Sequence, residues 1–241
     1  MSRGEVDDRA AARPQRSIDV TRFVVVSVIG LAIANSVGLG LGFVAQRLQD
    51  SVDTPFYESV ANRGTSWWTD VLSVVTKMGN VPQTKVLTVV LAVVLAGYFA
   101  VRGSRWWMPL LALPGAWIVT RLGQRVLAKI IDRDAGLPSI TGTPIGDFPS
   151  GGCARIIVVL GTAVLLLVHY LRLSRRTSRV LIGVVVLAGL VEAYCRASLN
   201  QHWLTDVISG VLYGAMMMAV IVTALRALDP DPPHLRAHPG A

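Results

Sequence analysis

The chain has 241 residues, of which 52% are hydrophobic and only 16% are charged, and its mean hydropathy is +0.53. An average soluble domain carries about 25% charged residues. The composition therefore excludes a disordered chain, and with two cysteines it also excludes a disulfide scaffold. It indicates a membrane protein, in which the formal net charge of +8 must be explained by where the basic residues lie.

Six apolar runs approach or reach the length of about 20 helical residues that a bilayer requires. They are residues 23–44, 86–101, 107–126, 153–171, 180–195 and 204–225. The second and fifth are short, so we expect their helices to extend into flanking polar residues. The sequence thus predicts an all-α integral membrane protein, with a six-transmembrane-helix bundle within residues 21–228. The polar ends, residues 1–20 and 229–241, are predicted to be disordered cytoplasmic tails.

Basic residues in the connections predict the orientation of this bundle. An even number of spans places both termini on one side, together with the short basic connections 102–105 and 172–179. Short loops rich in Lys and Arg lie in the cytoplasm. We therefore predict a multi-pass protein of the cell (inner) membrane with both termini cytoplasmic, and the charge needs no nucleic-acid partner.

A second basic set falls at the predicted outer ends of spans, where the positive-inside rule does not explain it. Three of its members, Arg121, Arg125 and Lys129, are four residues apart and share one helix face. The other members are Arg133, Arg155 and Arg196. These residues could contact outer-leaflet headgroups, or they could line a pocket for an anion.

The connection between the last two spans carries the most informative pattern. His202 and Asp206 are four residues apart at the start of a helix, so their side chains can meet. A carboxylate bonded to one imidazole nitrogen fixes the tautomer and leaves the other nitrogen free to attack. Arg196 could hold a phosphoryl group with a bidentate contact. This spacing predicts phosphoryl chemistry at the outer face.

The sequence entering span four offers an anion site of another kind. Ser150 is a good helix N-cap, and Gly151 and Gly152 follow it. Exposed backbone N–H groups and the helix dipole favour an anion at such a position.

These segments resemble the motifs of the type-2 phosphatidic acid phosphatase superfamily, the lipid phosphate phosphatases. The family pattern is Lys-x6-Arg-Pro, then Pro-Ser-Gly-His, then Ser-Arg-x5-His-x3-Asp, and the similarity covers residues 53–214. The resemblance implies a six-helix bundle with the motifs at the outer face and a reaction that needs no metal or cofactor. It implies that His202 is the nucleophile, forming a phosphohistidine, and that Asp206 orients it. The predicted phosphate-binding residues are Lys129, Arg133, Ser150, Gly151, Gly152 and Arg196.

The sequence departs from the family pattern in two motifs. Lys129 is present, but Gly136 and Leu137 replace the Arg-Pro pair, and Arg133 is a candidate substitute for the missing arginine. In the second motif, Gly152 stands where the family has its general-acid histidine.

Two acidic residues are candidates for the missing proton donor. Glu192 lies one helical turn before Arg196, and an intramembrane carboxyl group is a functional candidate by default. Its other interpretation is a salt bridge to Arg196. Asp147, just before the second motif, is the weaker candidate.

The loss of a general acid favours one class of substrate. General acid catalysis typically contributes about 10²–10⁴-fold, and an alkoxide leaving group needs the proton more than a phosphate does. We therefore predict a polyprenyl diphosphate substrate. The alternatives are an impaired protein that binds lipid phosphates, and a lipid phosphotransferase. Cys153 and Cys195 could form a disulfide or remain two buried free thiols, and the oligomeric state is left open.

Overall fold

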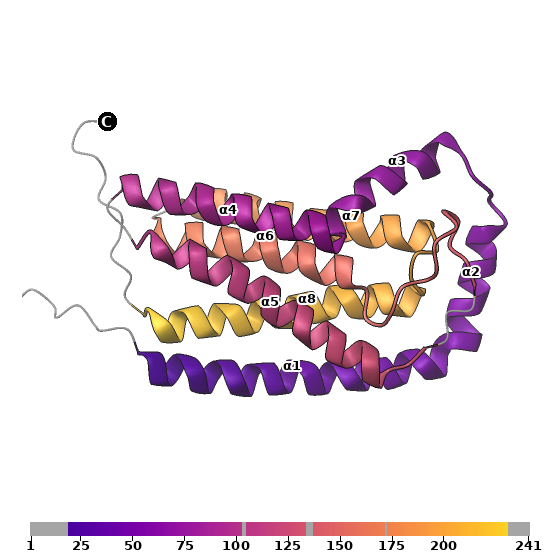
Figure 1. Ribbon diagram of the computed structural model, residues 1–241, viewed down its shortest axis with the longest axis horizontal. Helices are drawn as coiled ribbons and strands as arrows, with labels where there is room; N and C mark the ends of the chain where they lie inside the picture. The colour runs from indigo at the N-terminus through magenta and orange to yellow at the C-terminus, as the bar shows by residue number, and fades with distance from the viewer. Residues whose placement is uncertain (1–18, 103–104, 134–136, 172, 231–241) are drawn as a thin grey trace, which may run out of the picture.

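The computed structural model describes residues 19–102, 105–133, 137–171 and 173–230, and these form an all-helical bundle (Figure 1). Its long helices are α1 (Val20–Leu48), α4 (Val81–Val101), α5 (Trp107–Ile130), α6 (Gly151–Tyr170), α7 (Arg175–Ser198) and α8 (Leu204–Leu228). Four short helical segments connect α1 to α4: η1 (Gln49–Asp53), α2 (Thr54–Ala61), α3 (Trp67–Val75) and η2 (Thr76–Gly79). The described residues contain no named strand, only an isolated β-bridge between Pro138 and Pro144. The predicted all-α fold class is confirmed.

Five segments are long and apolar enough to cross a membrane: Val20–Ala61, α4, α6, α7 and α8. The predicted short runs do extend, since α4 begins at Val81 and α7 spans Arg175–Ser198. α5 is as long as the others but is not among the five, and it contains Pro114 and three basic residues. Membrane character is therefore confirmed, whereas the count of six spans stays a prediction.

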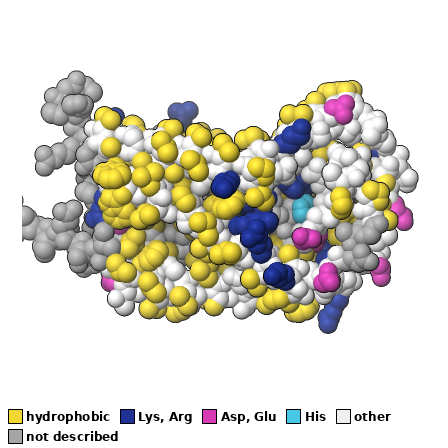
Figure 2. Space-filling view, in the orientation of Figure 1, with side chains coloured by type: hydrophobic (Ala, Val, Ile, Leu, Met, Phe, Trp, Pro, Cys, Tyr) yellow, Lys and Arg dark blue, Asp and Glu magenta, His cyan; other side chains and the backbone are white. Residues whose placement is uncertain are grey.

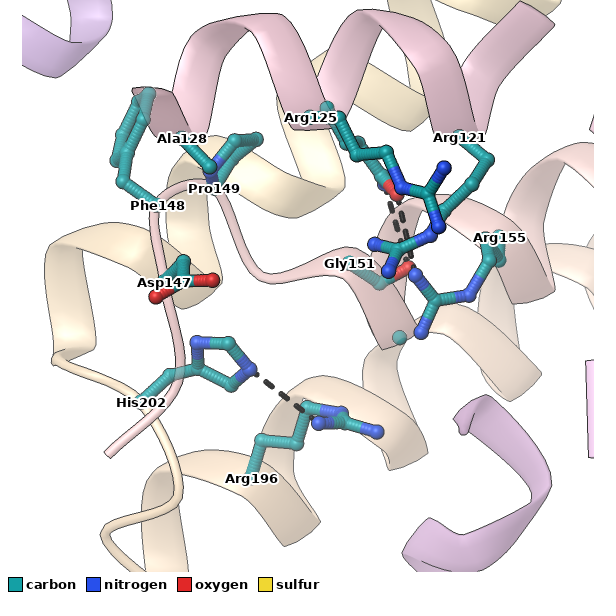
Figure 3. Close-up of a pocket in the computed structure, with 12 residues that line it drawn as sticks. Arg121, Arg125, Ala128, Asp147, Phe148, Pro149, Gly151, Arg155, Arg196 and His202 are labelled. Carbon is teal, nitrogen blue, oxygen red and sulfur yellow. Dashed lines mark hydrogen bonds between the residues drawn. The ribbon is translucent and has the colours of Figure 1, made fainter. Parts of the chain in front are cut away.

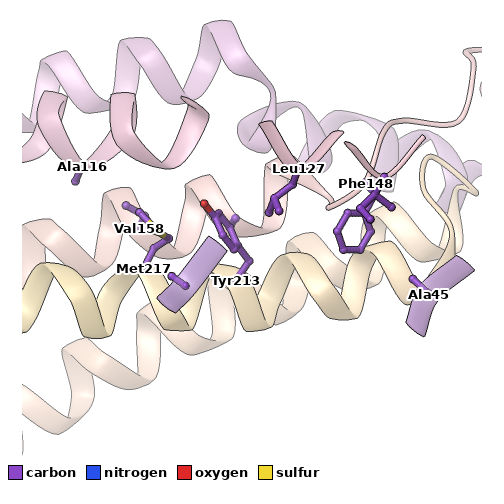
Figure 4. Close-up of a cluster of buried hydrophobic side chains, with 10 residues drawn as sticks. Ala45, Ala116, Leu127, Phe148, Val158, Tyr213 and Met217 are labelled. Atoms are coloured by element: carbon purple, nitrogen blue, oxygen red, sulfur yellow. The ribbon is translucent and has the colours of Figure 1, made fainter. Parts of the chain in front are cut away.

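Helix α6 is the centre of the bundle, because 67% of its most apolar window is buried against α4, α5, α7 and α8. Leu127 of α5, Val158 of α6, and Tyr213 and Met217 of α8 pack in one hydrophobic cluster (Figure 4). Exposed hydrophobic side chains cover the flank of the bundle, as expected for contact with lipid (Figure 2).

Helix α1 packs on this core through small residues. Its buried positions are Ala34, Gly38, Gly42 and Ala45. A Cβ at Gly38 would press on Leu127, and a Cβ at Gly42 would collide with Ile131. Small residues one turn apart let helix backbones approach closely. Such close packing holds helices together inside a membrane, where the hydrophobic effect does not act between them.

The described chain ends meet at one end of the bundle, where the amide of Asp19 donates to the carbonyl of Leu228 at 3.2 Å. There Asp229 is buried, accepts a hydrogen bond from the Tyr170 hydroxyl at 2.9 Å and pairs with Arg105 at 3.1 Å. Asp229, the first residue of the predicted C-terminal tail, thus packs within the bundle. The rest of both predicted tails, residues 1–18 and 231–241, lies outside the described residues. The three motif segments lie at the opposite end.

Candidate active site

A cavity of about 190 Å³ lies at the motif end of the bundle, between α5, α6 and the connection from α7 to α8 (Figure 3). Its lining residues are Arg121, Gln124, Arg125, Ala128, Asp147, Phe148, Pro149, Gly151, Gly152, Arg155, Arg196 and His202. Four arginines and a single aspartate make this lining strongly positive. The cavity is therefore suited to an anion, which answers the question raised by the basic residues at the outer ends of the spans.

His202 lies on the connection that follows α7. The chain turns there at Asn200, whose φ of 51° is a left-handed conformation that asparagine tolerates. The Gly146 amide donates to the Gln201 carbonyl at 2.8 Å, and a side chain at Gly146 would collide with the His202 ring. The loop before α6 is thereby fixed against the imidazole.

The imidazole of His202 is held in a neutral state. Burial, then the charges of Arg196 and Arg155, lower the pKa of His202 well below its usual range. Arg196 Nη1 lies 3.3 Å from Nε2. A guanidinium only donates, so Nε2 accepts and the ring proton is on Nδ1. Nε2 therefore carries the lone pair that a nucleophile needs.

The predicted bond from Asp206 to His202 is not formed in this structure. Asp206 Oδ1 instead accepts from Arg133, while Asp206 Oδ2 and His202 Nδ1 are both buried without a hydrogen-bond partner in the described part of the chain. Arg133 attracts the carboxylate more strongly than a neutral imidazole can, because it is charged and itself buried. The two atoms that the predicted bond would join thus lack partners.

Arg133, a predicted phosphate contact, does not line the cavity and is paired with other residues. Its Nη2 pairs with Asp53 Oδ2 at 2.6 Å and its Nε donates to Gln49 Oε1 at 3.2 Å. Asp53 also accepts from the amide and hydroxyl of Thr205, at 2.9 and 2.6 Å, and so caps the start of α8. Asp53 and Asp206 together occupy the guanidinium, which ties η1 to α8.

Arg196 is held on three sides, at the position where the family has its phosphate-binding arginine. Its Nε donates to Glu192 Oε1 at 2.5 Å, its Nη2 to Asn80 Oδ1 at 3.0 Å, and its Nη1 faces His202. Thr76 also donates to Glu192 Oε1, at 3.2 Å. Glu192 does not line the cavity, so the structure supports the salt-bridge interpretation of Glu192 over that of proton donor.

We expect Glu192→Gln to lower phosphate release by roughly 10-fold, because a neutral amide positions the Arg196 guanidinium less firmly. A positioning role leaves the alkaline side of the pH profile unchanged, whereas loss of a general acid removes it. The measurement is kcat/KM across pH for the variant and the wild type. A flattened alkaline limb would show that Glu192 is the proton donor after all.

The second motif supplies the floor of the cavity. Gly151 and Gly152 begin α6 and line the cavity, where the first N–H groups of a helix have no intrahelical partner. Ser150 is fully buried beside Cys153, with its hydroxyl 3.4 Å from Sγ, and it does not line the cavity. Of the three predicted phosphate contacts, the two glycines are in place and Ser150 is not.

The structure shows why position 152, where the family has its histidine, carries no side chain here. A Cβ at this position would collide with the Arg196 guanidinium. Arg196 therefore occupies the space into which a side chain at 152 would project. Asp147 lies on the cavity wall near His202 (Figure 3), so among the described acidic residues it is the one that lines the cavity, although Glu192 was the stronger expectation.

The sequence indicated a basic helix face on α5 and predicted Lys129 of that face as a phosphate contact. Lys129 is exposed and does not line the cavity, whereas Arg125 and Arg121, one and two turns earlier on the same face, do. Arg155 of α6 was also left out of the predicted site. Cys153 and Cys195 are both free and buried, so the free-thiol alternative holds. Within the described residues, no group of three or more metal-ligating side chains is present.

Comparison with known proteins identifies the family to which this site belongs. The family model of the PAP2 superfamily matches residues 87–229, which is more than half of the chain. The chain belongs to the PAP2 superfamily. This assignment agrees with the resemblance inferred from the motifs of the sequence.

A solved structure shows the same fold. It is described as the crystal structure of the first transmembrane PAP2 type phosphatidylglycerolphosphate phosphatase from Bacillus subtilis. The match has a TM-score of 0.66 and 20% sequence identity, and it covers 79% of this PAP2 chain and 93% of the other. Among curated proteins, none matches the chain.

Proposed function

We propose that this PAP2 protein is a membrane lipid phosphatase that removes the terminal phosphate from a polyprenyl diphosphate, with His202 as the nucleophile. The observation that carries the proposal is a neutral imidazole whose Nε2 faces Arg196 in a cavity lined by four arginines. A nucleophile next to preorganised cations is the arrangement that phosphoryl transfer requires.

The reaction has two steps. The Nε2 lone pair forms a bond to the terminal phosphorus, and the bond from this phosphorus to the bridging oxygen breaks, with its electron pair kept by the leaving lipid phosphate. Water then attacks the phosphohistidine, the N–P bond breaks, and its electron pair returns to Nε2. The protons of the water pass to the released phosphate. Arg196 leaves Nε2 during the first step and binds phosphoryl oxygens instead.

A diphosphate substrate suits a site that lacks the general-acid histidine of the family. With Gly152 in place of the family's general acid, a leaving group that needs no proton is favoured. A lipid phosphate is such a group, whereas the alkoxide released from a lipid monophosphate is not. We place the site at the outer face of the cell membrane, since the basic residues Arg102, Arg105 and Arg175 lie at the opposite end of the bundle.

The test is phosphate release by the purified full-length protein from four lipids: a polyprenyl diphosphate, the matching polyprenyl phosphate, phosphatidic acid and phosphatidylglycerol phosphate. We expect the diphosphate to be hydrolysed fastest, by at least about 10²-fold over the monophosphate of the same chain. Faster turnover of the monophosphate would contradict the proposed substrate. Absence of phosphate release from all four would contradict the proposed activity.

A lipid-phosphate-binding protein without turnover is the second candidate function. The observation that favours it is Asp206, which is engaged by Arg133 rather than by His202. A protein of this kind would bind a lipid diphosphate and release no phosphate. A lipid phosphotransferase would instead move the phosphoryl group of His202 to another acceptor, which labelled substrate and product analysis would show.

A further inference from the structure

Three arginines of the cavity lie apart from the motif arginine Arg196. Arg121 and Arg125 are one turn apart on α5, and Arg155 is on the second turn of α6. Figure 3 shows them gathered on the α5–α6 side of the cavity, with His202 and Arg196 on the opposite side. The cavity therefore has two cationic regions.

The α5–α6 region has donors that the protein leaves without a partner. Arg155 is 4% exposed; its Nη1 donates to Gln124 Oε1 at 3.1 Å and its Nη2 to the Gly79 carbonyl at 2.8 Å. Its Nε has no partner among the described residues. Arg121 Nε is likewise buried and unpaired. Neither Arg121 nor Arg125 forms an ion pair within the described residues. Buried donors of this kind call for a ligand that accepts hydrogen bonds.

The charge of the wall exceeds what one phosphate can neutralise. Four arginines against Asp147 leave a surplus of three positive charges, because 4 − 1 = 3. A phosphate monoester carries about −1.5 to −2 at pH 7. A diphosphate monoester carries a further negative charge on its second phosphoryl group. The positive charge of the cavity lining is therefore matched by the negative charge of two linked phosphoryl groups.

We propose that Arg121, Arg125 and Arg155 form a second phosphoryl subsite, which binds the phosphoryl group that stays on the lipid when a diphosphate is cleaved. This inference rests on the proposed function. The terminal phosphoryl group is bound beside His202 and Arg196, and the lipid-linked one lies on the α5–α6 side. Both subsites belong to the same cavity.

The subsite stabilises the negative charge that develops on the leaving group, which a general acid would otherwise neutralise with a proton. In the diphosphate, the lipid-linked phosphoryl group carries one negative charge. When the bond from the bridging oxygen to the terminal phosphorus breaks, the electron pair stays on that oxygen and the group carries two. A guanidinium does not release a proton, so the arginines stabilise this new charge electrostatically.

The position of the subsite also fits the order of groups along the lipid. On α5, Arg121 and Arg125 are followed by Leu122 and Val126, which are 53% and 52% exposed on the hydrophobic flank. The lipid-linked phosphoryl group is therefore held next to the surface that faces the bilayer, where its polyprenyl chain lies. Figure 2 shows Lys and Arg side chains set among hydrophobic ones on this flank.

The experiment compares Arg121→Gln and Arg125→Gln with wild type on a polyprenyl diphosphate and on the monophosphate of the same chain. We expect kcat/KM on the diphosphate to fall by roughly 10²-fold, and kcat to fall with it, because the contact strengthens as the bond breaks. On the monophosphate we expect a loss of less than about threefold, since that substrate has no second phosphoryl group. Arg47→Gln, the same change at an exposed position outside the cavity, is the matched control. Equal losses on both substrates, or no loss on either, would overturn the subsite.

A binding measurement separates this inference from the proposed function. Affinity for inorganic diphosphate and for inorganic phosphate is measured by calorimetry on the wild type, Arg121→Gln and Arg125→Gln. The subsite predicts that either substitution weakens diphosphate binding at least about tenfold more than phosphate binding. This result would support the subsite even if no phosphate release were found. Equal weakening for both anions would reject the subsite while leaving the proposed hydrolysis intact.

Discussion

Replacing His202 with alanine should reduce phosphate release by at least about 10³-fold, the largest effect on activity expected of any substitution in this chain. The cavity would keep its arginines, but no other histidine within the described residues lines it. His169, the other described histidine, lies at the far end of the bundle near Asp229. Without Nε2 at 202, the proposed phosphohistidine has no atom on which to form.

Two measurements test this prediction. The first is phosphate release by His202→Ala beside His169→Ala, a matched control that should keep the wild-type rate. The second is labelling by a lipid diphosphate that is radioactive in its terminal phosphorus, quenched in alkali to preserve phosphohistidine. Label on the wild type and none on His202→Ala is the expected outcome. A covalent label on the His202→Ala variant would place the nucleophile elsewhere.

The sequence predicted the fold well because the features that determine it are local. Apolar runs of sufficient length predicted α1, α4, α6, α7 and α8, and their lengths compare directly with the thickness of a bilayer. Residues 107–126 were also predicted as a span, and helix α5 forms there, but α5 is not among the five segments that are long and apolar enough to cross a membrane. The mean hydropathy of α5 is lowered by Arg121 and Arg125, which line the cavity.

Spacing within one segment predicted which residues line the cavity better than it predicted contacts between distant segments. The spacing of Arg196 and His202 correctly placed both residues at one cavity. The pairing of Arg133 with Asp53 could not be predicted, because the two residues are 80 positions apart and no local pattern indicates the pair. The position of Lys129 outside the cavity could not be predicted either, because a helical face extends along several turns and the sequence does not show at which turn the cavity lies.

Replacing Arg133 with methionine should be the most destabilising single substitution at this end of the bundle. Its side chain is 2% exposed and pairs with Asp53 and Asp206, both of which are fully buried. Removing one partner of a buried ion pair leaves uncompensated charge and typically costs about 3–5 kcal/mol. Here two carboxylates would lose their partner, so the expected loss in the free energy of unfolding is at the upper end of that range.

Thermal and denaturant unfolding of the purified protein in detergent would measure this loss. Arg47→Met is the matched control: the residue is exposed and forms no ion pair within the described residues, so its unfolding should shift by no more than about 0.5 kcal/mol. Adding Asp53→Asn to Arg133→Met removes one of the stranded carboxylates and should restore part of the stability, because Thr205 can still donate to the amide oxygen. If Arg133→Met unfolds like wild type while phosphate release is lost, Arg133 acts on the substrate after all. The substrate would then replace Asp53 and Asp206 as the partner of Arg133.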